Sequence, residues 1–391
     1  MGGQSYILRY AQTNAAITTA LEANRTSIAK PRGFEKNSDD SVRKRVASVT
    51  PTSARGRAHS PPVSRPRGFL ACLNPPPLLL VHSLKPRSTR LSKGEITEEE
   101  YEKFIEKETK SAVRFQERIG LDLLVHGEPE RNDLVQYFRE RLSGFVFTQN
   151  AWVQFYGSRY VRPPTIVSDV TRKEPMTVRW SKYAQSFTSK PMKGMLTGPV
   201  TILNWSFPRV DISREIQAQQ LALALRDEVI DLEAAGIKAI QVDEPALREG
   251  LPLRRADWNS YLNWAGNSFK LSTAGVGDHT QTHSHFCYSD DIFPHLVILI
   301  EAPKSDLKLI NTFRHYGYSN NIGPGVYDVR SPRVPGNVEI QERLKAMLAY
   351  LDQSLLYVNP DCGLKTRGWK ETEASLINLV EAARWARQNH A

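Results

Sequence analysis

The chain has 391 residues, 40% hydrophobic and 24% charged, which is typical of a globular protein, and no window is apolar enough for a membrane-spanning helix. Its net charge of +10 is uneven: residues 1–94 hold 16 Lys and Arg against 4 Asp and Glu, whereas the remainder holds 36 against 38. The basic excess belongs to the amino-terminal segment, and no aromatic residues interleave its charges, so we expect no nucleic-acid surface. Three cysteines are too few for a disulfide framework and suit the cytoplasm.

The amino-terminal quarter of the chain gives weak structural signals. Residues 10–50 are expected to form one or two helices that end in the run 41–47. Residues 51–94 carry proline clusters and scattered arginines without a sustained period, which predicts a linker or disorder. Regular structure is expected over 95–391, beginning with a helix at Thr97, because Thr97 followed by Glu100 is a capping-box pattern.

From residue 121 onward, short apolar runs alternate with helical patterns, the clearest of which are 213–235 and 376–386. This alternation predicts a parallel sheet flanked by helices. Reactive residues end many different strands, which favours a (β/α)8 TIM-like barrel over a doubly wound sheet and requires an eighth strand before residue 121. The seven expected strands are Leu121–His126, Met192–Thr201, Ile237–Asp243, Gln281–Cys287, Leu296–Glu301, Ile322–Asp328 and Leu355–Asn359.

One set of strand-end residues has the chemistry of a metal site. His285 and Cys287 are two residues apart, so they face the same way in a strand. Glu301 ends the next expected strand and Cys362 follows the last one. A His, Cys, Glu and Cys set suits tetrahedral zinc. The alternative is that these residues are unrelated, since they contain no CxxC pair.

Two other candidates can each be interpreted in two ways, and a third gives only weak evidence. Asp243 and Glu244 at a strand end could bind an ammonium group or perform acid–base chemistry, or they could cap a helix. Trp205 could be a flat stacking surface or a core residue. The segment 126–133, which begins His126-Gly-Glu128, is weak evidence by itself.

Seven long motifs give stronger evidence than the spacing of single residues. The motifs are HGEPERND (126–133), GSRYVRPP (157–164), KGMLTGPVTILNWSF (193–207), QVDEPALREGLPLR (241–254), THSHFCYSD (282–290), IGPGVYD (322–328) and YVNPDCGLKTR (357–367). Together they resemble the carboxy-terminal catalytic domain of cobalamin-independent methionine synthase, a 5-methyltetrahydropteroyltriglutamate–homocysteine S-methyltransferase. The resemblance covers about 96–391, and residues near 10–51 look like the helical connector that precedes the family's barrel.

The resemblance implies a zinc-dependent transfer of a methyl group from 5-methyltetrahydrofolate polyglutamate to homocysteine, giving methionine, in a cytoplasmic monomer. It implies that homocysteine binds through its sulfur at the zinc. The residues implied are His285, Cys287, Glu301 and Cys362 for zinc, Glu128 and Asp243 for the homocysteine amino group, and Arg159, Trp205 and Glu249 for the folate.

Two departures from the family lie in the site. Where the family has histidine as the proton donor, in YDIHSP, this chain reads YDVRSP with Arg330. Arginine stays protonated and cannot relay a proton, so we expect slow chemistry. The alternative function is a catalytically impaired or non-catalytic remnant that at most binds zinc or homocysteine. Tyr160 also replaces the usual cysteine beside Arg159.

The remaining departures concern the barrel. Only residues 288–295 connect the fifth and sixth strands, and the family has a longer helix there. The family's first-strand motif TIGSFPQT is absent, and LLLVHSLKPRS (78–88) stands in its place. The family's amino-terminal second barrel has no counterpart in this sequence. We therefore expect a barrel altered at its first strand and at its crossover between strands five and six.

Overall fold

The structure is a computed structural model, and ten segments of the chain are described. They are residues 40–48, 70–71, 90–91, 94–131, 133–148, 152–154, 160–287, 297–300, 321–364 and 367–389. Within these segments, no helix is both long enough and apolar enough to cross a membrane.

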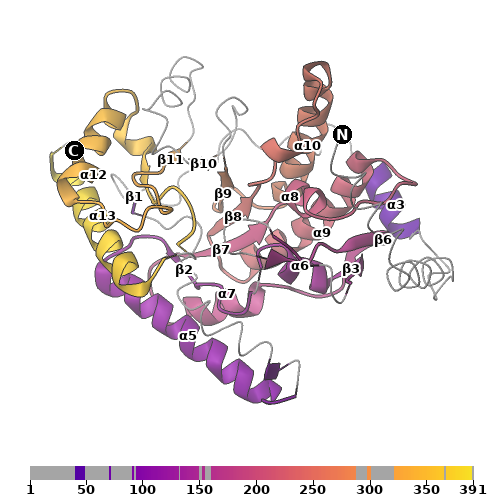
Figure 1. Cartoon of the computed structure of the whole chain (residues 1–391), viewed down its shortest axis with the longest axis horizontal. Coiled ribbons are helices and arrows are strands. Elements are labelled where there is room, and N and C mark those ends of the chain that lie inside the picture. The colour runs from indigo at the N-terminus through magenta and orange to yellow at the C-terminus, as the bar shows by residue number, and fades with distance from the viewer. Residues whose placement is uncertain are drawn as a thin grey trace, which may run out of the picture. The chain divides into compact units, whose positions relative to one another are not determined.

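A parallel sheet with the spatial order β11-β10-β9-β8-β7-β2 forms the centre of the fold (Figure 1). β12 joins β11 through isolated parallel bridges, and β1 pairs in parallel with β12. Eight strands are thereby linked edge to edge, but no β1–β2 pairing occurs among the described residues. The parallel α/β fold is confirmed, and closure of the barrel is not. The strands are β1 (Leu70–Ala71), β2 (Leu124–Val125), β7 (Met192–Thr197), β8 (Ala239–Asp243), β9 (Gln281–Phe286), β10 (Val297–Ile300), β11 (Ile322–Pro324) and β12 (Tyr357–Val358).

All seven expected strands are present, with shorter bounds, but the carboxyl end of one was wrong. The apolar run 192–201 was expected to be one strand, yet β7 ends at Thr197. Gly198 is the N-cap of helix α8, which starts at Pro199. Proline lacks an N–H and is favoured in the first turn of a helix, so this residue turns the chain out of the sheet. The eighth strand, β1, lies inside the range 51–94 that was expected to be linker.

Helices connect the strands, and their ends follow the sequence signals. The helix expected over 213–235 is α9, with Ser213 as its N-cap and Ala235 as its C-cap. The antiparallel pairs β3 (Leu142–Val146) with β6 (Thr165–Arg172), and β4 (Val153–Gln154) with β5 (Tyr160–Val161), were not predicted. The helices are α3 (Asp40–Ala47), α5 (Glu98–Ile119), α6 (Gln136–Arg141), α7 (Val178–Gln185), α8 (Pro199–Asn204), α9 (Arg214–Ala234), α10 (Trp258–Thr273), α12 (Asn337–Leu348) and α13 (Trp369–Asn389), with 3-10 turns at Arg248–Gly250, Arg255–Asp257 and Gln353–Leu355.

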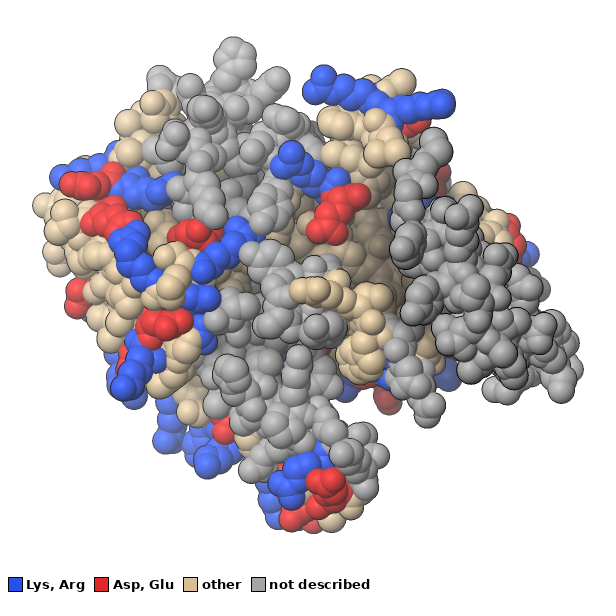
Figure 2. Space-filling model, in the orientation of Figure 1, with Lys and Arg blue, Asp and Glu red and all other residues tan. Residues whose placement is uncertain are grey.

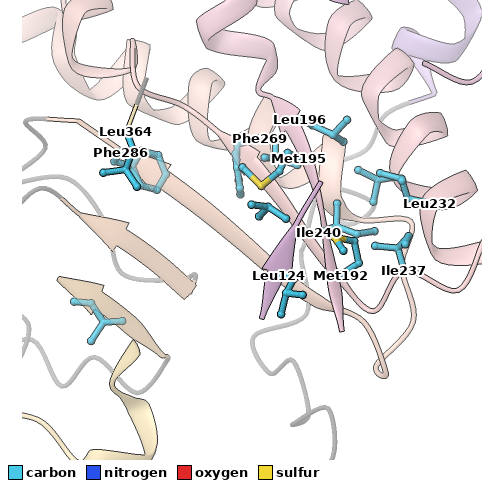
Figure 3. Close-up of a cluster of buried hydrophobic side chains, with 14 of the residues drawn as sticks. Leu124, Met192, Met195, Leu196, Leu232, Ile237, Ile240, Phe269, Phe286 and Leu364 are labelled. Atoms are coloured by element: carbon cyan, nitrogen blue, oxygen red, sulfur yellow. The ribbon is translucent and has the colours of Figure 1, made fainter. Parts of the chain in front are cut away.

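The two faces of the sheet carry different side chains. Leu232 of α9 and Ile237 lie beside the strand residues Met192 and Ile240 in the hydrophobic cluster (Figure 3). A Cβ added at Gly194 would lie 3.1 Å from Leu232, so helix and strand approach closely there. Because strand side chains alternate, the residues between these positions face the opposite side of the sheet. That side is polar and buried, and it leads to the candidate site.

Helix α3 uses part of the basic excess for docking on the body. Arg45 donates to both carboxylate oxygens of Asp227 on α9, with the shortest contact at 2.9 Å. Arg43 lies 3.7 Å from Asp169, and Val42, the residue before Arg43, is buried. On the described part of the face in Figure 2, basic and acidic side chains are intermixed.

Thr97→Ala should lower the free energy of unfolding by about 1 kcal/mol, because it removes the N-cap of α5. The expected capping box is confirmed: Glu100 N donates to Thr97 Oγ1 at 3.1 Å, and Thr97 N donates to Glu100 at 2.9 Å. Urea unfolding followed by circular dichroism measures the loss. Thr97→Ser keeps the hydroxyl and is the control, so equal midpoints for the alanine and serine variants would show that the cap adds nothing.

Candidate metal and substrate site

A cluster of one imidazole and two thiols lies at the carboxyl end of β9. His285 is in β9, Cys287 follows its last residue, and Cys362 follows β12. Cys287 Sγ lies 3.2 Å from His285 Nε2, and Cys362 Sγ lies 3.8 Å from the same nitrogen. The three donor atoms lie within 4.8 Å of one another and could hold a metal ion. Cys362 and His285 are 77 positions apart in the sequence, and they meet because their strands are parallel and end on the same side.

The donor set fits zinc. His285 is buried, and the pKa of the Cys362 thiol lies well below its usual value because Cys287 and His285 both hydrogen-bond to it. Thiolate and neutral imidazole are the ligands that zinc prefers. Glu301, the fourth ligand implied by the resemblance, lies outside the described residues. The described neighbour is β10, whose Leu299 pairs with His285, so the short connector leaves β10 beside β9.

Asp243 and Glu244 are adjacent in sequence but have different environments. Glu244 accepts hydrogen bonds from Val200 N at 3.0 Å and from Thr201 N and Oγ1 at 2.7 Å, so it caps the start of α8. Burial raises its pKa to about 7 against these hydrogen bonds. Asp243 instead accepts a hydrogen bond of 2.7 Å from Gln241 Nε2. The helix-cap interpretation therefore holds for Glu244, and Asp243 remains the candidate for binding.

The pKa of Asp243 identifies its charged neighbours. Burial raises this pKa to about 6, the charge of His285 lowers it, and the charge of Glu128 raises it. The N–H of Glu244, the residue after Asp243, donates to the His285 carbonyl at 2.9 Å, so Asp243 lies beside the strand that carries the metal cluster. The charges of His285 and Glu128 both act on Asp243 from nearby. These three residues come from the ends of three different strands.

Glu128 follows β2 in an unusual backbone conformation. Its φ of 53° is the one positive value at a non-glycine residue of the described chain, and such strain occurs often at functional sites. Arg131 forms an ion pair with Glu128 and donates through Nε to Glu130 at 3.0 Å. Burial raises the pKa of Glu130, but the charges of His126 and Arg131 outweigh it and lower the pKa to about 2. This buried charge network holds Glu128 in place.

The expected folate residues are described only in part. Trp205 is half-buried at the end of α8 and donates through Nε1 to Glu249 Oε2 at 2.9 Å, so these two meet as a pair. Arg139 donates to the Trp205 carbonyl at 2.6 Å and fixes the backbone there. Trp205 is thus neither fully exposed nor a core residue. Arg159 lies outside the described residues, as does the side chain of Tyr160.

Arg330 lies in a turn after β11 that is held by hydrogen bonds. Its backbone N–H donates to Asp328 at 2.8 Å, and the N–H of Val329 donates to Asp361 at 2.9 Å. Asp361 is the residue before Cys362, so the turn of Arg330 is anchored to the segment that carries one candidate ligand. Backbone N–H groups and two aspartate side chains therefore fix the position of this turn.

Sequence reasoning missed a polar chain beneath the site. Lys193 of β7 is fully buried and donates to Gln241 Oε1 at 2.6 Å, and Gln241 in turn donates to Asp243. Arg131, which pairs with Glu128, was also not singled out. The sequence could have indicated Lys193, because side chains alternate along a strand and its position in the expected strand puts it on the same face as the site.

Comparisons with known proteins agree with this geometry. Residues 83–385 match the family described as "Cobalamin-independent synthase, Catalytic domain". The chain is 53% identical to a Schizosaccharomyces pombe protein named "Probable 5-methyltetrahydropteroyltriglutamate–homocysteine methyltransferase", covering 96% of this chain and 51% of that protein. It is 52% identical to a Caulobacter vibrioides protein named as such a methyltransferase, covering 95% and 50%. The chain spans about half the length of these curated relatives.

A solved structure has a similar fold. It is a B12-independent methionine synthase from a Shewanella species in complex with selenomethionine. The TM-score is 0.67 at 24% identity, and the match covers 75% of this chain and 91% of that one. At this identity the likeness supports the fold, and the residues of the site are argued from this chain itself.

Proposed function

We propose that this chain, which belongs to the cobalamin-independent synthase family, transfers a methyl group from 5-methyltetrahydropteroyltriglutamate to the sulfur of homocysteine, giving methionine. The observation that carries the proposal is the His285, Cys287 and Cys362 cluster beside Asp243. A thiol-binding metal position next to a buried carboxylate matches the two ends of an amino-thiol substrate.

The metal we propose is zinc, held by His285, Cys287, Cys362 and Glu301. We include Glu301 because it follows β10 in the sequence, and β10, which ends at Ile300, runs beside β9 in the register that pairs Leu299 with His285. A zinc ion bound here would lower the pKa of the homocysteine thiol so that its sulfur is a nucleophile near neutral pH.

The chain's own residues orient the two substrates. We assign the homocysteine amino group to Asp243 and Glu128, because two carboxylates near the thiol-binding cluster attract an ammonium group. We assign the folate to Arg159, Tyr160, Trp205 and Glu249. The Trp205 ring, held through its N–H by Glu249, is a flat surface suited to an aromatic ring system. We further propose a (β/α)8 barrel that is altered at its first strand and at the crossover between strands five and six, acting as a cytoplasmic monomer.

Departure of the folate nitrogen is the difficult step of the reaction. The folate nitrogen that loses the methyl group is a poor leaving group unless it is protonated, so a proton must reach it. Arg330 can stabilise negative charge but does not give up its proton near neutral pH. In this chain water must supply the proton, which makes the transfer slow.

The same residue favours a second candidate function. With Arg330 in the proton-donor position, the chain would bind zinc and homocysteine without turning over. This impaired form has the metal and amino-group residues of an active enzyme and differs only in the chemical step.

Zinc content and methionine formation, measured on the purified full-length chain, test the proposal. We expect one zinc per chain and slow methionine production that requires both homocysteine and the folate. Chelator-treated protein is the control and should regain activity when zinc is returned. Zinc and homocysteine binding without methionine would favour the impaired form, and a chain that retains no zinc would contradict both candidates.

A further inference from the structure

We propose that Lys193 is a positioning residue which, through Gln241, fixes the Asp243 carboxylate so that one oxygen is presented to the ammonium group of the amino-acid substrate. This inference rests on the proposed function, because it concerns the same substrate. It adds two residues, Lys193 of β7 and Gln241 of β8, to those that act on the substrate.

Lys193 lies on the polar face of β7, with its side chain fully buried. An ammonium group taken out of water is costly unless it is hydrogen-bonded, so a buried lysine is retained where its charge has a use. Its Nζ donates to Gln241 Oε1 at 2.6 Å. In the register of β7 with β8, Met195 pairs with Gln241. Lys193 lies two residues before Met195 on the same face of β7, and its side chain reaches along the sheet to the Gln241 amide.

Two hydrogen bonds of Gln241 fix the orientation of its amide. The Lys193 ammonium can only donate a hydrogen bond, and an ionised carboxylate can only accept one. The amide oxygen must therefore face Lys193, and the amide nitrogen must face Asp243, which it meets at 2.7 Å. Without the lysine, only the hydrogen bond to Asp243 would hold the amide, so the amide and the carboxylate would both be fixed less firmly.

The two carboxylate oxygens of Asp243 differ in their hydrogen bonding. Oδ1 accepts from Gln241, whereas Oδ2 is buried and has no hydrogen-bond partner among the described residues. A buried carboxylate oxygen without a donor is rare and points to a ligand that supplies one. An ammonium group offers three donors, and Asp243 lies within electrostatic reach of His285, where the sulfur of the same substrate would bind.

Equilibrium binding to the zinc-loaded full-length chain tests the inference, with two probes. L-homocysteine carries the ammonium group, and 4-mercaptobutanoate has the same thiol and carboxylate without it. We expect Lys193→Met to weaken homocysteine binding about tenfold, in line with the loss of one hydrogen bond to a charged group, and to leave the analogue unchanged. Gln241→Met should do the same.

The double variant separates a relay from two independent effects. If Lys193 acts through Gln241, the double variant should bind homocysteine no more weakly than either single variant. Met195→Leu, a volume-conserving change on the same face of β7, is the matched control and should bind both probes normally. Zinc content and thermal melts verify that each variant is folded, and Gln241→Met carries the test if Lys193→Met does not fold.

The possible outcomes distinguish the role of Lys193 from the proposed function. Single variants that keep the wild-type preference for homocysteine over the analogue, or effects that add in the double variant, would overturn the role of Lys193. Equal losses for both probes would indicate a general structural role and would overturn it as well. Wild-type protein that binds no homocysteine would overturn the proposed function itself, and this assignment with it.

Discussion

Cys362→Ser should lower the affinity for zinc by more than about 100-fold, so that the purified variant loses its zinc. Loss of residues that merely support metal ligands costs roughly 10–100-fold, and Cys362 would be a ligand itself. Its sulfur lies 3.8 Å from His285 Nε2, and its pKa is held well below the usual value by hydrogen bonds from Cys287 and His285. A serine hydroxyl is a harder donor that stays protonated, so it replaces the thiolate poorly.

Zinc per chain after dialysis, together with competition against a chromophoric chelator, measures this loss. Cys72→Ser is the matched control: Cys72 is not among the four proposed ligands, so its removal should leave the zinc content unchanged. The thermal midpoint of Cys362→Ser should also cease to depend on added zinc, since a metal stabilises only the state that binds it. Unchanged zinc content in this variant would overturn the assignment of Cys362 as a ligand.

The sequence predicted best the features that depend on local chemistry. The capping box at Thr97 was confirmed because it is made by residues three positions apart, and the helix expected over 213–235 was confirmed as α9. The meeting of His285, Cys287 and Cys362 was also predicted, although it is a long-range contact. It followed from a general property of parallel strands, whose carboxyl ends meet on one side of the sheet.

The features that were missed depend on contacts between residues that are far apart in the sequence. An eighth strand was expected before residue 121, but its position was not: β1 is two residues long and has no apolar alternation, so only its pairing with β12 locates it. The difference between Asp243 and Glu244 was left open because either carboxylate could cap α8, and only the distances from Val200 and Thr201 decide it. Lys193 was missed because a lysine within an apolar run gives no sign of its partner, which lies on the next strand.

The site joins two kinds of residue with different tolerance to change. Arg131 and Glu244 bury charges within networks of several hydrogen bonds, so removing one partner leaves an uncompensated buried group. Arg330 is only half-buried, and the turn that carries it is fixed by backbone hydrogen bonds to Asp328 and Asp361. A side-chain change at 330 should therefore alter the chemistry while the scaffold stays intact, which makes it the most informative position for activity.

Arg330→His should raise methyl transfer by about 10²- to 10⁴-fold, the usual contribution of a general acid. The imidazole has an unperturbed pKa near 6.5 and can deliver a proton to the departing folate nitrogen, whereas the guanidinium cannot. Single-turnover rates with saturating substrates measure the change. Because the acid must be protonated to act, the rate of the variant should be highest at low pH and fall as pH rises through the imidazole pKa, whereas the wild-type rate should lack this step.

Arg330→Lys is the matched control, because it keeps a positive charge on a flexible side chain and supplies no proton donor that titrates near neutral pH. If lysine and histidine give equal rates, the gain does not come from proton transfer. If histidine gives no gain while zinc and homocysteine still bind, the missing acid is not what limits the enzyme. The placement of the two substrates would then be at fault, and the impaired form of the family would be the better description of this chain.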